Sequence, residues 1–318
     1  MADEEPPAKK AAPKSVLKFL LGHDLSEMGQ LLTEPVREKR TTKIETPKYT
    51  VGVSSMQGWR VSMEDAHTVL PTLPEDEAPP ASFFGVYDGH GGTKVAEFVS
   101  KNLHRYLVKS KEYQAGKIKN AMEFTFLDLD NTMAKNKEIN EDMSGSTAIV
   151  VLVKNNVLYC ANVGDSRAVA YVNGGTIPLS EDHKPTNPSE KTRILEAGGW
   201  VEQERVNGSL ALSRALGDFQ FKTDTGKTPE KQVVSPFPDV VTKQLSPEWK
   251  FLIIACDGIW ECLTNEEVTN FVKVRLDEGL QPDAICEQLM DKCLAPNTEN
   301  CGPGCDNMTV IIIVFKWK

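Results

Sequence analysis

Four apolar, strand-like runs in this chain each meet an aspartate, and this pattern limits what the chain can fold into more than any other feature. The runs are FFGVYDGHGG (Phe83–Gly92), YCANVGDSR (Tyr159–Arg167), FLIIACDGIWE (Phe251–Glu261) and, with the aspartate before the strand, CDNMTVIIIVF (Cys305–Phe315). A carboxylate at the mouth of a buried strand is costly unless a positive charge compensates it. One Asp-Gly pair after a strand is most simply a turn. Four such strand ends in one chain favour a metal cluster.

The order of the remaining elements predicts an α+β fold. Strand patterns dominate from Tyr49 onward and include a meander over residues 146–175, with turns at Asn155-Asn156 and at Asn173-Gly174-Gly175. Apolar stripes at helical spacing cover residues 93–109, 117–135, 187–197, 264–278 and 282–294. Because the helices come mostly in pairs between runs of antiparallel strands, we expect paired helices to cover sheets.

The chain divides into a tail and one large folded domain. Residues 1–45 begin with the low-complexity stretch MADEEPPAKKAAPK, followed by a helical pattern over Ser15–Leu32. We expect this segment to be a tail with an amphipathic helix that docks a partner or a membrane surface. Residues 46–318 form the folded domain, which is large enough to bury a sizeable core.

Charge and hydropathy limit which kinds of partner the protein can bind and where in the cell we expect it. The formal net charge of −9 argues against a nucleic-acid-binding surface, and no apolar run is long enough for a transmembrane span. The seven cysteines are odd in number, as expected of reduced thiols in the cytoplasm or the nucleus. The sequence MGQLLT (Met28–Thr33) has the form of a myristoylation signal but is internal, so peripheral membrane attachment requires a lipidated product that starts at Met28.

The residues around two of the motifs suggest a reaction. GWRVSMEDAH supplies Arg60, Glu64 and Asp65, and YDGHGG supplies Asp88 and His90. Carboxylates suit hard cations such as Mg²⁺ or Mn²⁺, and two such ions can hold a bridging hydroxide for attack on phosphorus. An arginine grips phosphate oxygens, and a histidine can protonate a departing alkoxide.

In this order, the motifs closely resemble the metal-dependent (type 2C, PPM) protein serine/threonine phosphatase family. The similarity runs from about Tyr49 to Phe315 and rests on GWRVSMEDAH, VYDGHGG, SGSTA, ANVGDSR, LALSRALGD, ACDGIWE and CDNMT. It implies a sandwich of two mostly antiparallel β-sheets flanked by paired helices. It also makes residues 46–318 a phosphatase catalytic domain that hydrolyses phosphoserine and phosphothreonine in phosphorylated protein substrates. We expect the chain to be a monomer.

The resemblance assigns roles position by position. It implies that Asp88 bridges two Mg²⁺ or Mn²⁺ ions. It further implies that Asp257 and Asp306 are ligands of the first ion, and that Glu64 and the Gly89 carbonyl are ligands of the second. It also makes Arg60 the phosphate-binding residue and His90 the general acid, with Asp65 flanking the metal pair.

The resemblance further implies a weaker third metal site, in which Asp165 acts with Asp257. The family usually has aspartate at the position of Glu261, so either Glu261 contributes to a weak third site or it faces solvent. Arg214 either touches the substrate or forms a structural salt bridge. The main rival to an active enzyme is a pseudophosphatase scaffold, but the chain keeps every ligand of the central pair, which favours activity.

Overall fold

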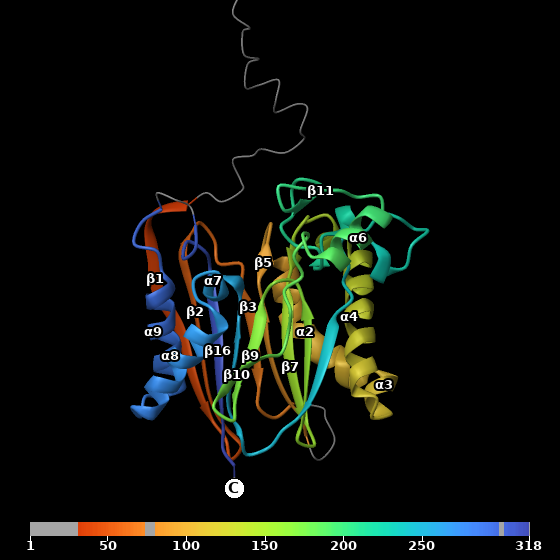
Figure 1. The fold of residues 1–318 in the computed structure, drawn as a ribbon. Helices are drawn as coiled ribbons and strands as arrows, with labels where there is room; N and C mark the ends of the chain where they lie inside the picture. Colours follow the sequence, from red (N-terminus) through yellow and green to blue (C-terminus); the bar gives the residue numbers. More distant parts are fainter. Residues whose placement is uncertain (1–30, 74–79, 299–301, 318) are drawn as a thin grey trace, which may run out of the picture.

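Two antiparallel sheets pack face to face between two layers of helices in the computed structural model of this chain (Figure 1). The structure describes residues 31–73, 80–298 and 302–317. The α+β sandwich expected from the sequence is therefore confirmed. Each sheet is covered on its outer face by helices, and the C-terminal end of the chain lies at the lower edge in Figure 1.

The larger sheet has six strands, in the order β1-β2-β16-β15-β9-β10. These are β1 (Leu31–Glu45), β2 (Tyr49–Arg60), β16 (Met308–Phe315), β15 (Trp249–Ala255), β9 (Arg167–Val172) and β10 (Gly175–Pro178). The second sheet has five strands, in the order β14-β8-β7-β4-β3. These are β14 (Asp239–Gln244), β8 (Val157–Val163), β7 (Ala148–Lys154), β4 (Ser82–Tyr87) and β3 (Ala66–Leu70).

The helices form one group on each outer face. The five-stranded sheet is covered by α2 (Lys94–Lys109) and α4 (Ile118–Lys135), each followed by a short helix, α3 (Lys111–Gln114) and α5 (Lys137–Asn140). The six-stranded sheet is covered by α7 (Asp257–Trp260), α8 (Asn265–Asp277) and α9 (Pro282–Cys293). The helix α8 starts with the capping box that Thr264 and Glu267 predict. Within the described ranges, none of the helices has the length and apolar character that crossing a bilayer requires.

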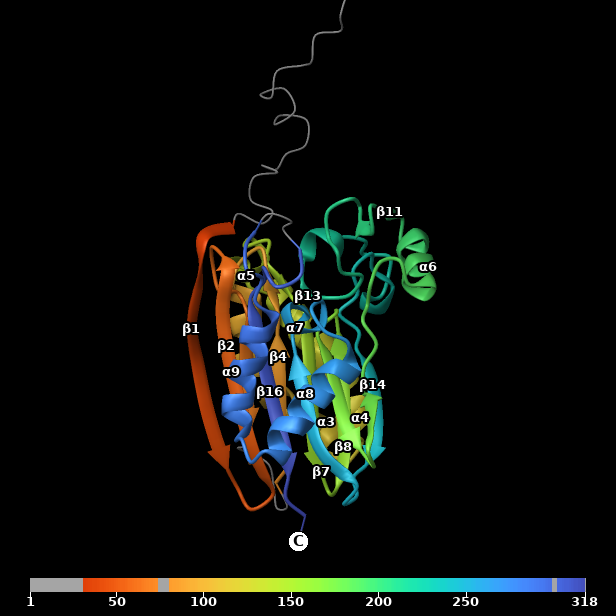
Figure 2. The ribbon, with the colours of Figure 1, turned by 60° about the vertical axis from the view of Figure 1, so that its left-hand side comes forward.

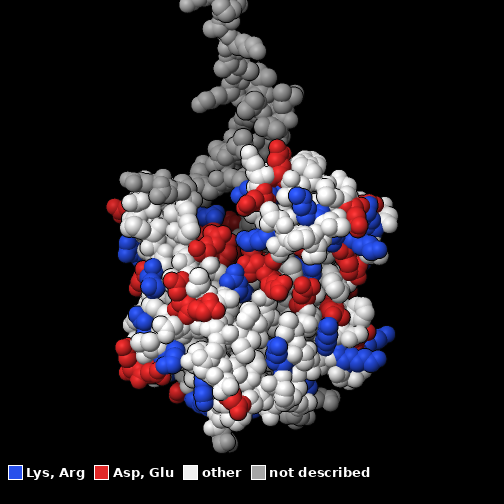
Figure 3. Space-filling view, viewed as in Figure 1, with Lys and Arg blue, Asp and Glu red and all other residues white. Residues whose placement is uncertain are grey.

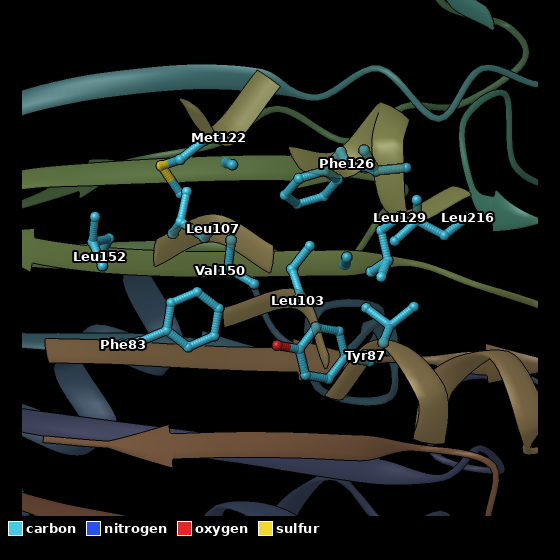
Figure 4. Close-up of a cluster of buried hydrophobic side chains, with 14 of the residues drawn as sticks. Phe83, Tyr87, Leu103, Leu107, Met122, Phe126, Leu129, Val150, Leu152 and Leu216 are labelled. Carbon is cyan, nitrogen blue, oxygen red and sulfur yellow. The ribbon is translucent and has the colours of Figure 1, made fainter. Parts of the chain in front are cut away.

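Strand periodicity explains why both faces of each sheet are buried. In β15, Ile254 joins the core between the sheets, whereas Ile253 packs under α8 and α9. In β4, Phe84 faces the core between the sheets, whereas Phe83 faces α2 and α4. Figure 4 shows this second cluster, in which Phe83 lies with Leu103, Met122 and Phe126 between strands and helices. Successive side chains point to opposite faces, so a nearly continuous apolar strand serves two cores.

A smaller lobe covers one end of the sandwich, visible at the upper right of Figure 2. It comprises α6 (Pro188–Glu196), β11 (Val201–Glu202), β12 (Arg205–Val206), η1 (Phe219–Phe221) and η2 (Pro229–Lys231), and we call residues 187–238 the flap. The flap has its own small core of Ile194, Val206, Ala215 and Val234. A three-stranded sheet, β13 (Leu216–Gly217), β6 (Gly145–Ser146) and β5 (Gly89–His90), joins the flap to the sandwich.

The assignment of all of residues 1–45 to a tail is wrong for its last part. Leu31–Glu45 is strand β1 at the edge of the six-stranded sheet, paired with β2. Its side chains are half-buried or exposed and none is fully buried, and it carries Pro35 beside an irregularity in the register. Polar residues and proline are typical of an edge strand, so the composition resembled that of a tail. The start of MGQLLT and all but the last two residues of the docking helix predicted over Ser15–Leu32 lie outside the described residues.

We expect Gly52→Ala to destabilise the protein by about 2 kcal/mol. A Cβ atom at Gly52 in β2 would lie 2.2 Å from the backbone nitrogen of Asp283 in α9, and backbone cannot move aside as a side chain can. A matched control is Gly175→Ala in β10, where the nearest atom would be 3.8 Å away. Urea unfolding of both variants tests this, and equal free energies of unfolding would contradict the close packing of α9 on β2.

Candidate metal centre

Strand ends from both sheets bring carboxylates together at one end of the sandwich. Asp88 directly follows β4, Asp257 follows β15 after one residue, and Asp165 lies in the loop between β8 and β9. Their side-chain ligand atoms lie within 4.8 Å of one another. Figure 3 shows acidic side chains gathered across the upper middle of one face, with basic side chains among them. The structure thus assembles three of the aspartates that the strand-end pattern singled out.

A second group of potential ligands overlaps the first. Asp65, in the link between β2 and β3, lies within 4.8 Å of Asp88 and of the Cys256 thiol. Burial raises the pKa of Asp65 to about 7, and the nearby charge of Asp306 acts in the same direction. Asp65 therefore stands closer to the centre of the cluster than its predicted flanking role suggested.

This cluster fits a divalent cation. Burial raises the pKa values of Asp88 and Asp257, and the neighbouring carboxylates raise both further. The Oδ1 atom of Asp257 is buried and has no hydrogen-bond partner among the described residues. Several ionised carboxylates at this spacing repel one another, whereas hard cations such as Mg²⁺ and Mn²⁺ prefer oxygen ligands. The donor set therefore suits such ions chemically.

Asp306 and Arg60 form an ion pair at the edge of the cluster. The Nη2 atom of Arg60 donates to Oδ2 of Asp306 at 2.5 Å, and both side chains are partly exposed. The adjacent Asn307, which the sequence analysis gave no role, accepts a hydrogen bond from the Glu64 N–H at 2.9 Å and donates to the carbonyl groups of Gln57 and Ser62. Asn307 thus ties the start of β16 to the segment that carries Arg60 and Glu64.

Glu64 lies over the loop that follows β4. Its carboxylate accepts hydrogen bonds from the Ser62 hydroxyl at 2.8 Å and from the Gly92 N–H at 3.2 Å. A Cβ atom on Gly89 would lie 2.4 Å from the Glu64 carbonyl oxygen, so only glycine allows the two segments to approach this closely. Glu64 and Gly89 are therefore neighbours, although Glu64 is not among the side chains gathered within 4.8 Å.

The region of the expected third site contains a basic side chain. Lys184 forms an ion pair with Asp165, and the charges of Asp257 and Glu261 also act on its ammonium group. Glu261 is exposed at the end of α7, where its N–H donates to the Asp257 carbonyl. Neighbouring residues still remove part of the water around its carboxylate, which raises the pKa of Glu261, while Lys184 opposes this shift. Lys184 is a residue that the sequence analysis missed.

His90 is paired with a carboxylate that the sequence analysis also missed. The Nε2 atom of His90 lies 2.7 Å from Oδ2 of Asp218, and the Asp218 side chain is almost fully buried. Burial lowers the pKa of His90, but the charge and hydrogen bond of Asp218 raise it, and the net direction is upward. Asp218 is the last residue of the LALSRALGD motif. An aspartate that directly follows an apolar run was the only sign in the sequence that this residue could belong to the site.

The three-stranded sheet is built around this pair. A Cβ atom on Gly145 in β6 would lie 2.4 Å from Nε2 of His90 and 2.2 Å from Oδ2 of Asp218, so glycine leaves room for the contact. Beside Asp218, the Gly217 N–H donates to Oδ1 of Asp130 in α4 at 2.9 Å. Asp130 also forms a buried ion pair with Lys222. The turn that carries Asp218 is therefore anchored to the helical layer.

Arg214 forms structural ion pairs, one of the two roles left open by the sequence. Its guanidinium contacts the buried Glu190 of α6 at 2.7 Å and Asp239 of β14 at 2.9 Å. Glu190 forms a second ion pair with Arg193, whose Nη2 atom lies 2.8 Å from its Oε2 atom. These contacts hold the flap to the five-stranded sheet.

Comparisons with known proteins show the family and the fold to which this chain belongs. Residues 49–302 match a family model described as protein phosphatase 2C. A probable protein phosphatase 2C of Caenorhabditis elegans is 53% identical over 286 residues, covering 90% of this chain and 80% of the relative. Protein phosphatase 2C homolog 2 of Schizosaccharomyces pombe is 47% identical over 291 residues, covering 91% and 79%. The crystal structure of a serine-threonine phosphatase 2C from Toxoplasma gondii shares the fold, with a TM-score of 0.73 at 23% identity, covering 88% of this chain and 99% of that one.

The raised carboxylate pKa values predict how stability changes with pH. Because the folded carboxylates bind protons more tightly than the unfolded ones, the metal-free protein should lose stability as the pH rises from about 4 to about 7. Added Mn²⁺ should raise the unfolding midpoint at pH 7 by roughly 5 °C or more, and Asp257→Asn should weaken this response. Thermal scans with chelator or Mn²⁺ test this, with the exposed Asp128→Asn as control. A midpoint that rises with pH in chelator would contradict the electrostatic argument.

Proposed function

This chain belongs to the protein phosphatase 2C family and is a protein serine/threonine phosphatase, and we propose that it hydrolyses phosphoserine and phosphothreonine at a dinuclear Mg²⁺ or Mn²⁺ centre. The observation that carries this proposal is the convergence of Asp88, Asp165 and Asp257 within 4.8 Å. Its substrates are phosphorylated proteins, and we propose that the chain acts as a monomer in the cytoplasm or the nucleus.

The proposed ligand set follows the positions of the residues in the fold. In this proposal Asp88 would be shared by the two ions, Asp257 and Asp306 would hold the first, and Glu64 with the Gly89 carbonyl would hold the second. Support comes from the place of Asp88 in both ligand groups and from the close approach of Glu64 and Gly89. When bound, the two ions supply a hydroxide nucleophile near neutral pH and offset the charge of the phosphate.

Arg60 orients the phosphate in this proposal. Its side chain is partly exposed at the edge of the cluster and is held by Asp306. The planar guanidinium can keep this contact through one nitrogen while the others donate to phosphate oxygens. Arg60 thereby fixes the phosphorus in line with the attacking and leaving oxygens.

His90 donates a proton to the leaving oxygen of the serine or threonine. Nε2 of His90 is hydrogen-bonded to Asp218 and is not free to donate to the substrate. In this proposal the proton that is transferred is therefore the one on Nδ1. The negative charge of Asp218 favours the protonated ring, which is the form a general acid must have. Asp218 itself acts only through His90 and is a positioning residue.

The assay that tests the reaction is hydrolysis of a phosphothreonine peptide with Mn²⁺ and after chelation. We expect turnover to require the metal and to fall by about 100-fold or more in Asp88→Asn, because the bridging ligand loses its charge. Asp128→Asn on the exposed face of α4 serves as the control. A variant at Asp88 with a native circular dichroism spectrum and full metal-dependent turnover would refute the assignment.

The proton-donor role of His90 predicts a dependence on the leaving group. His90→Gln should lower kcat about 100-fold or more on a phosphopeptide but much less on an activated aryl phosphate, whose leaving group needs no acid. Asp218→Asn should move the alkaline decline of kcat to lower pH, because the pKa of His90 falls when its partner loses its charge. Asp224→Asn, an exposed flap aspartate paired with Lys227, is the matched control. Equal losses on both substrates would exclude the acid role.

We also propose a weak third metal site formed by Asp165, Asp257 and Glu261. Glutamate has one methylene more than aspartate, and Mg²⁺ tolerates little departure from octahedral geometry, so Glu261→Asp should lower the metal concentration needed for full activity. Glu261→Gln should raise it, with little change in either variant at saturating metal. Activity titrations with Mn²⁺ check this, and three superimposable curves would show that Glu261 takes no part.

A further inference from the structure

Two cysteines behind the metal centre lie against each other. Cys262 comes two residues after the end of α7, and Cys293 is the last residue of α9. Sγ of Cys262 donates to the Cys293 carbonyl oxygen at 3.5 Å and to the Gly258 carbonyl oxygen at 3.3 Å, which places the two cysteines side by side. They come from elements separated in the chain by the whole of α8, so the tertiary fold alone brings them into contact.

One of the two thiols can be reached from solvent. Cys262 is half-buried and belongs to the wall of a hollow of about 380 Å³, together with Arg167, Trp260, Glu261 and Asn265. Cys293 is 6% exposed and does not line the hollow. A small solute that enters the hollow therefore meets Cys262 and not Cys293.

Three of the other cysteines are more deeply buried than Cys262. Cys160, Cys256 and Cys286 are at most 1% exposed. The thiols of Cys256 and Cys286 donate to the backbone carbonyl groups of Asn307 and Gly52, neither of which is a cysteine. Compared with these three, Cys262 is less buried and also contacts a second cysteine.

We propose that Cys262 and Cys293 form a redox-sensitive pair that a hydroperoxide converts into a disulfide. This modification site is separate from the phosphatase reaction and does not depend on the metal assignment. Cys262 is the residue that reacts with the oxidant, and Cys293 is the resolving residue.

The chemistry takes two steps. The Cys262 sulfur attacks the peroxide, an S–O bond forms as the O–O bond breaks, and the departing oxygen leaves as water or an alcohol with the thiol proton. The Cys293 sulfur then attacks the resulting sulfenic acid, an S–S bond forms as the S–O bond breaks, and water leaves with the second thiol proton. The hydroperoxide is reduced by two electrons and the two thiols are oxidised.

The disulfide would fasten the end of α7 to the end of α9. The helix α7 begins at Asp257, and the N–H of Glu261 at its end donates to the Asp257 carbonyl at 2.8 Å. A covalent link at Cys262 therefore restrains the short helix that carries a proposed metal ligand. Such a link also restricts the unfolded chain, so the oxidised protein should be more stable to heat.

The test is oxidation of the full chain with hydrogen peroxide, followed by non-reducing digestion and mass spectrometry. We expect a Cys262–Cys293 peptide pair that has lost two hydrogen atoms and that dithiothreitol separates. The unfolding midpoint of the oxidised protein should rise by about 5 °C and return on reduction. Cys262→Ser should abolish the link and the shift, whereas the buried control Cys286→Ser should keep both.

A trapping experiment tests the order of the steps. In Cys293→Ser the sulfenic acid on Cys262 has no resolving thiol, so dimedone should label Cys262 in this variant far more than in the wild type. A disulfide from Cys262 to any other cysteine would overturn the proposal. So would equal dimedone labelling of Cys262 in both proteins, or an oxidised wild type whose midpoint does not rise.

Discussion

Repulsion among buried carboxylates at one end of the sandwich is the constraint on which the rest of the structure depends. Asp88, Asp165 and Asp257 come from three different strand ends, and burial with mutual repulsion raises the pKa values of Asp88 and Asp257. Such an arrangement lowers the stability of the protein unless cations offset it. The chain supplies two of these, Arg60 at Asp306 and Lys184 at Asp165, and divalent ions suit the remaining oxygens.

The sandwich tolerates this loss of stability because its hydrophobic cores are large and its central strands are buried on both faces. Central strands such as β15 and β16 bury both faces, so they hold the strand ends rigidly while the charged residues project beyond them. Because the aspartates follow or precede these strands by only one or two residues, their positions follow from the sheet. The proposed metal ligands thus lie in short loops at the ends of rigid strands, which fixes their positions closely.

The pair of His90 and Asp218 depends on a different part of the fold. Asp218 reaches His90 through the three-stranded sheet, and the adjacent Gly217 and Lys222 are fastened to Asp130 of α4. Arg214 and Glu190 hold the flap to the five-stranded sheet. His90 is therefore positioned by the flap and the helical layer together, whereas the carboxylate cluster is positioned by the sheets. The pair and the cluster are thus held by different parts of the fold.

The sequence by itself predicted most of the long helices and strands and the carboxylates that gather at the centre. Alternating apolar residues defined central strands such as β15, helical stripes defined α2, α4, α8 and α9, and the aspartates at strand ends indicated a metal cluster. Tertiary structure decided which distant residues meet, because contacts such as Asp218 with His90, Lys184 with Asp165 and Cys262 with Cys293 leave no periodic signal in the chain. It also decided that Leu31–Glu45 is a strand, since an edge strand is stabilised by pairing with β2 and needs no apolar pattern of its own.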